Sequence, residues 1–323
     1  MEPIQGLHHV TAVTRDAQHS VDFYRNVLGQ RLVKKTVNFD APDAYHLYFG
    51  DEIGTPGSVL TFFAWSNVKR GVRGNGETAA VAYNVPEGSL GFWREYLQKQ
   101  GVPTQPIEMR FEEEVLSLED PDGMQVELVA SGPAAVIRHW EPGPVPQASA
   151  LSGFHSTTLW LDEIEPTAEL LTGQMGYTFT ERASNRHRFT GGPGSLARYI
   201  DILHRPRQPE DLPEQAIFGA GSIHHIAFRV PGDEQQLEYQ ASLRAAGYGV
   251  TPVRDRHYFH SIYFREPGGV LFEIATETPG FTIDETVETL GESLKLPEWF
   301  EPNRRLIEQE LPAITFRPVE RAI

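Results

Sequence analysis

The chain contains no cysteine, and this absence excludes several classes of site. Among its 323 residues there is no thiol to form a disulfide, a thiolate zinc site, an iron–sulfur cluster or a cysteine nucleophile. Any metal must therefore be held by nitrogen and oxygen donors. No run approaches about 18 consecutive apolar residues, and the N-terminus lacks a basic stretch followed by an apolar segment. We therefore expect a cytoplasmic protein that does not interact with membranes.

Positive charge is also scarce. The 28 Lys and Arg residues are outnumbered by 44 Asp and Glu residues, which gives a formal net charge of −16. This excess of negative charge disfavours nucleic acid as a partner. A small uncharged or weakly acidic substrate fits better. The hydrophobic content of 40% allows a large core, and we expect a globular protein that forms a homo-oligomer.

Two doubled histidines are the most informative feature that is present. The pairs His8–His9 and His224–His225 each open a short alternating segment. Adjacent residues of a strand point to opposite faces, so only one histidine of each pair can reach a common metal. In Ile226–Val230 the even positions are apolar, which places His225 on the open face. The same alternation selects His9 in the first pair.

A carboxylate accompanies these histidines. In Val270–Ile274 the apolar residues share one face, and Glu273 points away from them. His9, His225 and Glu273 are therefore the candidate metal ligands. Two histidines and one carboxylate form a donor set for a divalent metal with open coordination positions. A lone histidine at the start of a strand is usually structural, but two matching pairs with a carboxylate favour a metal site.

Self-similarity along the chain indicates four related units. Ile226–Pro231 aligns with Val81–Pro86, and the segments that begin at Leu7 and Phe154 align with the one that begins at Ile223. The ligand position is occupied in turn by His9, Ala80, Ser156 and His225, which are 69 to 76 residues apart. We expect the units to span residues 1–66, 77–130, 151–204 and 216–277, followed by a C-terminal tail at 278–323.

Each unit has a helical pattern that stops at a glycine, as a C-terminal cap in left-handed geometry requires. The expected helices are Ser20 to Leu28, Leu90 to Gln100, Pro166 to Met175 and Gln235 to Ala246. Strand-like runs broken by Gly, Pro and Asp follow each helix. One strand, one helix and about three more strands give a βαβββ unit. The expected linkers are Asn67 to Glu77, Ser131 to Ala150 and Arg205 to Gln215.

The ligand positions also predict how the units pair. Aligning the last strands places Phe62, Glu127, Asp201 and Glu273 at equivalent positions. If His9 and His225 share a metal, units one and four must lie side by side. Units two and three then form a second, metal-free half, in which Glu127, Asp201 and His155 are relics rather than a second site. The predicted fold class is α+β, with modules paired 1 with 4 and 2 with 3 into two curved-sheet barrels.

Four such units resemble the vicinal oxygen chelate superfamily, which includes extradiol dioxygenases, glyoxalase I and fosfomycin- and bleomycin-resistance proteins. The segment Ile262–Gly269, followed by Glu273, is similar to the extradiol dioxygenase signature. Arg256 stands where catechol-cleaving extradiol enzymes have a histidine. The three-ligand set leaves three positions free on a six-coordinate ion, because Phe62 cannot ligate. Those free positions favour a non-haem Fe(II) oxygenase.

A narrower resemblance covers the tail as well. The doubled histidines, Thr11, Arg256 and Tyr263, together with the tail segments Pro279–Phe281, Leu290–Glu292 and Leu311–Pro312, resemble ring-cleaving dioxygenases that act on hydroquinones. This resemblance implies Fe(II), with Mn(II) as the alternative ion, and O2 with a small aromatic diol as substrates. It also implies that the metal ligands are surrounded by five residues that assist the reaction, namely His8, Thr11, His224, Arg256 and Tyr263.

Other interpretations stay open at this point. Tyr263 is also compatible with an ordinary strand aromatic, Arg256 with a solvated loop charge, and His8 and His224 with buried histidines bonded to backbone carbonyls. For the whole chain, one alternative is a glyoxalase-type metal isomerase or lyase that needs no O2. A second is a non-catalytic protein that binds an aromatic toxin.

Overall fold

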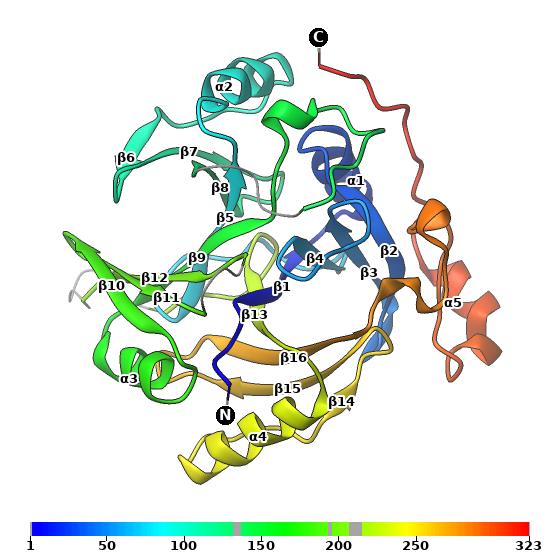
Figure 1. Cartoon of the computed structure of the whole chain (residues 1–323). Coiled ribbons are helices and arrows are strands. Elements are labelled where there is room, and N and C mark those ends of the chain that lie inside the picture. Colours follow the sequence, from blue (N-terminus) through cyan, green and yellow to red (C-terminus); the bar gives the residue numbers. More distant parts are fainter. Residues whose placement is uncertain (1, 132–136, 193–195, 207–214, 323) are drawn as a thin grey trace.

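The structure is a computed structural model that describes residues 2–131, 137–192, 196–206 and 215–322 (Figure 1). Parts of the two linkers expected at 131–150 and 205–215 lie outside these described residues. Within the described ranges, no helix is both long and apolar enough to cross a bilayer.

Each of the four units has the order strand, helix and three strands. The first contains β1 (Leu7–Thr14), α1 (Ala17–Asn26), β2 (Arg31–Asn38), β3 (Ala41–Gly50) and β4 (Val59–Ala64). The second contains β5 (Glu77–Val85), α2 (Leu90–Lys99), β6 (Glu108–Arg110), β7 (Glu113–Glu119) and β8 (Gln125–Ala130). The third contains β9 (Phe154–Leu161), α3 (Glu165–Gly173), β10 (Thr178–Ala183), β11 (Arg186–Thr190) and β12 (Tyr199–His204). The fourth contains β13 (Ile223–Val230), α4 (Asp233–Ala245), β14 (Arg254–Asp255), β15 (Phe259–Arg265) and β16 (Leu271–Pro279).

The strands form two eight-stranded sheets that pair the units as predicted. One sheet has the order β14-β15-β16-β13-β1-β4-β3-β2 and joins units four and one. The other has the order β10-β11-β12-β9-β5-β8-β7-β6 and joins units three and two. Both sheets curl into half-barrels, and α2, α3 and α4 lie on their outer sides (Figure 1). The predicted α+β class and the pairing of units 1 with 4 and 2 with 3 are confirmed.

The helices begin and end close to the expected residues. Gly29, Gly101, Gly176 and Gly247, which follow the four helices, all have positive φ, between 72° and 92°. Such angles suit glycine because it has no Cβ to clash. The first helix begins three residues earlier than expected, at Ala17, because the Asp16 side chain caps it by accepting the backbone N–H of His19.

Alternation along the central strands separates the apolar core from the polar face. On β1, Val10 and Ala12 belong to the main hydrophobic core, whereas Thr11 between them bonds a polar side chain of β4. On β13, Ile226 and Phe228 are fully buried in the same core. The candidate ligands therefore lie on the face of the sheet that does not carry this packing.

The C-terminal tail packs against the first unit. It contains short 3₁₀ turns and the helix α5 (Arg304–Glu310). Lys34 of β2 is completely buried, and its ammonium lies 2.5 Å from both Asp284 and Glu285 of the tail. Lys35 forms an isolated β-bridge with Leu294. The tail therefore covers the β2 edge of the sheet that joins units four and one.

Candidate metal centre and pocket

Each doubled histidine sits at a β-bulge where β1 and β13 pair. Leu7 and His9 pair with two consecutive residues of β13, so His8 between them is the extra residue of the first bulge. Thr11 and Ala12 are consecutive residues of β1 that pair with His225 and Ile223, so His224 is the extra residue of the second bulge. A bulge re-aims side chains and is common beside functional sites. The two bulges give both pairs the same local geometry.

The structure brings together the three side chains predicted as ligands. His9 Nε2 lies 3.3 Å from His225 Nε2 and 3.4 Å from Glu273 Oε2. The distance from His225 Nε2 to Glu273 Oε2 is 2.9 Å. Among the described residues, this is the one group of three His or acidic side chains whose donor atoms all lie within 4.8 Å of one another. Three converging nitrogen and oxygen donors are suited to a divalent metal.

The carboxylate in this cluster is completely buried. Ser261 donates to Glu273 Oε1, while Glu273 Oε2 has no hydrogen-bond partner. A buried charged oxygen without such a partner is costly. Burial would raise the pKa of Glu273, but the charges of His9 and His225 hold it well below its usual range. An ionised carboxylate oxygen that points at two imidazoles fits a metal ion.

The other histidine of each pair contacts the back of the ligand ring. His8 Nδ1 lies 2.9 Å from His9 Nδ1, and His224 Nδ1 lies 2.7 Å from His225 Nδ1. Burial is the main cause that lowers the pKa values of His8 and His224 to about 3. Both are therefore neutral at physiological pH, and each can accept a hydrogen bond from the neighbouring ring.

The fourth position of the metal-binding half is Thr61, and the expectation of Phe62 was wrong. In unit four, Glu273 pairs with Ala227, which follows the ligand His225 by two residues. In unit one, the residue two after the ligand His9 is Thr11, and Thr11 pairs with Thr61. Phe62 faces the opposite side and packs against Tyr24 in the core. A shift of one residue along a strand moves a side chain to the other face, so the sequence alignment of this strand was displaced by one.

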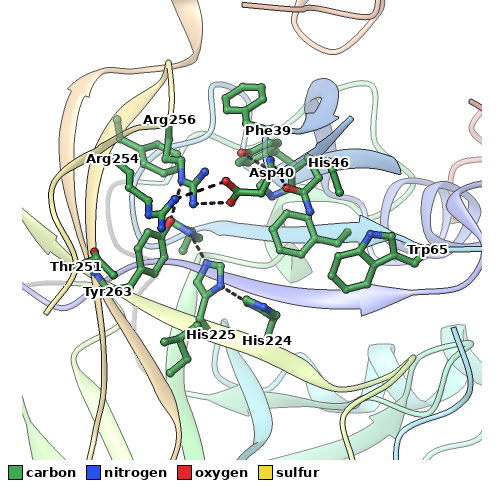
Figure 2. A pocket seen from close by; sticks show the side chains of 17 residues that line it. Phe39, Asp40, His46, Trp65, His224, His225, Thr251, Arg254, Arg256 and Tyr263 are labelled. Carbon is green, nitrogen blue, oxygen red and sulfur yellow. Dashed lines mark hydrogen bonds and ion pairs between the residues drawn. The ribbon is translucent and has the colours of Figure 1, made fainter. Parts of the chain in front are cut away.

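Next to the cluster lies a pocket with a volume of about 490 Å³ (Figure 2). Its walls combine aromatic rings, histidines and charged groups from units one and four. The lining residues are His9, Asn38, Phe39, Asp40, Ala41, His46, Tyr48, Phe63, Trp65, His224, His225, Thr251, Arg254, Arg256, Phe259, Tyr263 and Leu271. This volume lies within the range of about 300–1,000 Å³ that is typical of small-molecule sites.

Arg256 and Tyr263 meet at the pocket wall. Arg256 Nε donates to the Tyr263 hydroxyl over 3.1 Å, and its guanidinium lies 5.3 Å from the centre of the tyrosine ring. The Tyr263 ring also contacts His225 edge to face. Burial and the nearby Glu273 carboxylate raise the pKa of Tyr263. Its hydroxyl is therefore protonated and available as a hydrogen-bond donor.

Thr11 does not line the pocket but supports residues that do. Thr61 Oγ1 donates to Thr11 Oγ1, and His46 Nε2 lies 2.8 Å from Thr61 Oγ1. His46 Nδ1 lies 2.8 Å from the Tyr48 hydroxyl. Because Thr61 gives its own proton to Thr11, the His46 Nε2 must carry a proton that it donates to Thr61. Tyr48 then donates to His46 Nδ1, so this neutral imidazole has no free lone pair.

Sequence reasoning missed several pocket residues. His46 and Tyr48 of β3 alternate with Leu47 and Phe49, which belong to the core. That alternation was a usable signal, although nothing tied this strand to the ligands. Asp40 and Arg254 carry no such pattern. Two other histidines of unit four, His257 and His260, are not among the residues that line the pocket.

In the other sheet, the carboxylates at the position of Glu273 are bound by arginines. Glu127 receives two hydrogen bonds from Arg110. Asp201, which is completely buried, receives bonds from Arg186 and Arg188. Guanidinium groups therefore satisfy these acids, whereas the equivalent Glu273 oxygen faces two imidazoles.

Comparison with known families identifies matches along most of the chain. The profile of the "Glyoxalase/Bleomycin resistance protein/Dioxygenase superfamily" matches residues 6–128 and 153–274. A Bacillus subtilis protein named "Putative ring-cleaving dioxygenase MhqO" is 44% identical over 315 residues, which cover 98% of each chain. The "Chlorohydroquinone/hydroquinone 1,2-dioxygenase" of Sphingobium indicum is 39% identical over 303 residues, or 91% of this chain and 92% of that protein.

Solved structures show the same fold. The crystal structure of a "putative dioxygenase" from Bacillus subtilis has a TM-score of 0.93 and 43% identity, and the match covers 99% of this chain and 100% of that chain. Glyoxalase I from Zea mays has a TM-score of 0.61 and 12% identity, over 84% of this chain and 92% of that chain. At this low identity, the second match shows a shared fold only.

Proposed function

Because this chain belongs to the glyoxalase/bleomycin resistance protein/dioxygenase superfamily, we propose that it is an Fe(II)-dependent dioxygenase that cleaves the ring of a hydroquinone-like diol with O2. The observation that carries the proposal is the convergence of His9, His225 and Glu273 beside an aromatic-lined pocket, with no fourth His or acidic donor in the group among the residues that the structure describes. The relative at 44% identity is named a ring-cleaving dioxygenase and the relative at 39% identity a chlorohydroquinone/hydroquinone 1,2-dioxygenase, which supports the same reaction class.

The ion would be held by His9 Nε2, His225 Nε2 and Glu273 Oε2. Fe(II) bound there would supply the redox chemistry that lets O2 react with an aromatic ring, and Mn(II) is the alternative ion. The fit rests on the buried Glu273 oxygen that has no hydrogen-bond partner. Two histidines and one carboxylate in this arrangement leave coordination positions open.

His8 and His224 would orient the ligand rings. If the Nε2 atoms of His9 and His225 face a metal, their Nδ1 atoms carry the protons. The neutral Nδ1 atoms of His8 and His224, at 2.9 Å and 2.7 Å, then accept those protons as hydrogen bonds. Such partners fix the tautomer and the orientation of a ligating histidine.

Tyr263 would act as the proton donor of the pocket. Arg256 donates to its hydroxyl oxygen, and the tyrosine would give its own proton to a bound diol or a reacting oxygen atom. The raised pKa keeps this proton in place until a stronger base takes it. Arg256, which also lines the pocket, would hold the remote hydroxyl of the ring.

The apolar side of the pocket would hold the ring itself. Phe259 lies 5.0 Å from the rings of both His8 and His9, and Phe63 and Trp65 are in contact at 5.3 Å. Aromatic walls of this kind favour a planar aromatic ligand. They also exclude water from the reacting carbon atoms.

Oxygen uptake tests the proposal directly. Protein purified without oxygen and loaded with Fe(II) should consume one O2 for each hydroquinone that disappears, with both oxygen atoms entering the ring-opened product. His225→Ala should abolish this uptake and the bound iron together. Absence of uptake with hydroquinones and catechols, despite bound iron, would remove the dioxygenase proposal.

Size measurements by light scattering would test the expected homo-oligomer, and the cytoplasmic location also stays a prediction.

A further inference from the structure

Two arginines approach the pocket from unit four and face one carboxylate from unit one. Arg254 belongs to β14, and Arg256 follows it. Opposite them, Asp40 lies in the turn between β2 and β3. Arg256 Nη2 lies 3.0 Å from Asp40 Oδ2, and Arg254 Nη1 lies 3.7 Å from Asp40 Oδ1 (Figure 2). The three residues form what we term the mouth cluster.

The mouth cluster has more positive than negative charge. Apart from histidines, three residues with ionisable acidic or basic side chains line the pocket, namely Asp40, Arg254 and Arg256. In a chain with a net charge of −16, a pocket with two cations and one anion is a local exception. Chains of this overall charge repel anions, so a site meant for an anion needs such a local surplus.

Asp40 does not satisfy both arginines. Its side chain is 58% exposed, and that of Arg254 is 49% exposed. A separation of 3.7 Å is longer than a normal N–H···O hydrogen bond of about 2.7–3.2 Å. Exposed ion pairs of this kind contribute little stability. The Arg254 guanidinium therefore retains donors that a ligand in the pocket can use.

The pocket also has room for a substituent next to the ring. Its volume of about 490 Å³ is in the range of drug-sized ligands rather than of a single unsubstituted ring. In Figure 2, Arg254, Arg256 and Tyr263 gather on one side of the pocket, while Trp65 lies on the other. A ring held near the aromatic side would direct a polar substituent toward the mouth cluster.

We propose that the preferred substrate is an aromatic diol that carries a carboxylate, and that Arg254 and Arg256 bind this carboxylate in place of Asp40. This inference rests on the proposed dioxygenase function and adds the substrate class. Arginine matches the planar geometry of a carboxylate with paired N–H donors. Asp40 acts as an internal competitor, so it sets how strongly the pocket prefers acids over neutral diols.

Paired substrates test this proposal. The ratio of kcat/KM for 2,5-dihydroxybenzoate to that for hydroquinone should exceed one in the wild-type enzyme. Arg254→Gln should lower the ratio by roughly tenfold, as expected for loss of a charge-assisted hydrogen bond, and Asp40→Asn should raise it. Arg94→Gln removes a positive charge from the exposed face of α2 and should leave the ratio unchanged. An equal ratio in wild type and Arg254→Gln would overturn the proposal.

A binding measurement separates this proposal from the dioxygenase function. Calorimetry on Zn²⁺-loaded protein, which cannot perform the redox reaction, should show tighter binding of 3-hydroxybenzoate, whose carboxylate is meta to the hydroxyl as in 2,5-dihydroxybenzoate, than of phenol. Arg254→Gln should remove the difference, whereas Arg94→Gln should keep it. Arg254-dependent binding without O2 uptake would support acid recognition and overturn the dioxygenase function. Oxygen uptake without any preference for the acid would support the dioxygenase function and overturn acid recognition.

Discussion

Thr61 of β4 lies opposite Thr11 of β1, with 2.8 Å between their hydroxyl oxygens. Thr61 occupies the position that Glu273 occupies in the other half of the same sheet. Its oxygen is already engaged by Thr11 and His46, so it is not a fourth ligand. One residue therefore decides whether this half of the sheet supplies one protein donor or two.

Thr61→Glu should convert the three-donor cluster into a four-donor cluster. We expect the variant to bind the metal more tightly. The rate of O2 uptake should fall by about tenfold or more, because the new carboxylate fills one open coordination position. Chelator competition measures the affinity, and an oxygen electrode measures the uptake. Thr61→Gln has a similar size but a weaker donor, so it controls for packing. Full uptake by metal-loaded Thr61→Glu would contradict this account.

His224→Ala should weaken metal binding although His224 is not a candidate ligand. Loss of the acceptor at 2.7 Å leaves His225 Nδ1 without its partner, and losses of such partners cost about 10–100-fold in metal affinity. His224→Gln, whose amide oxygen can accept the same bond, should restore part of the affinity. His260→Ala is a matched control, since His260 bonds Asp233 away from the pocket. Equal affinity of His224→Ala and wild type would rule out the orienting role.

Tyr263→Phe should separate proton donation from metal binding. The substitution keeps the ring that contacts His225 but removes the hydroxyl that Arg256 orients. We expect kcat to fall by about 10²–10⁴, the usual range for loss of a general acid, while the metal affinity stays the same. Tyr248→Phe, at a partly buried position that packs on Phe264, is the control. Unchanged kcat would make Tyr263 an ordinary strand aromatic.

The sequence was sufficient for the architecture because the fold is repeated. Four glycine-terminated helices and four aligned opening strands predicted the units, and the positions of His9 and His225 predicted which units pair. Strand alternation also selected the three side chains that converge. These signals are local and periodic, so one chain contains four copies of the same information.

The rest depended on geometry that alternation does not encode. A regular strand would point His8 and His9 in opposite directions, and only the bulge explains how their Nδ1 atoms meet. The one-residue displacement at Phe62 arose because that strand has no histidine or acid to fix its register. Asp40 meets Arg254 and Arg256 across more than 200 residues of chain, a contact that no local pattern predicts.

The contacts of Asp284 in the tail make the stability of the protein depend on pH. Burial would raise the pKa of Asp284, but bonds from His257, Lys34 and Tyr258 lower it to about 2. The pKa of an unfolded aspartate is about 3.9. Because the folded value is the lower one, the contact stabilises the protein fully above the unfolded pKa. That stabilisation is lost as the pH falls through about 2.

Asp284→Asn should therefore destabilise the protein most at neutral pH. We expect the free energy of unfolding to fall by about 1–2 kcal/mol there, since one bond to a buried charge loses its ionised partner. Denaturant titrations should show that the difference in unfolding free energy between wild type and Asp284→Asn is smaller at about pH 3, below the unfolded pKa, than at neutral pH. Asp43→Asn, at an exposed position of β3, controls for charge removal alone. A difference independent of pH would mean that packing, and not the ionised Asp284, holds the tail against β2.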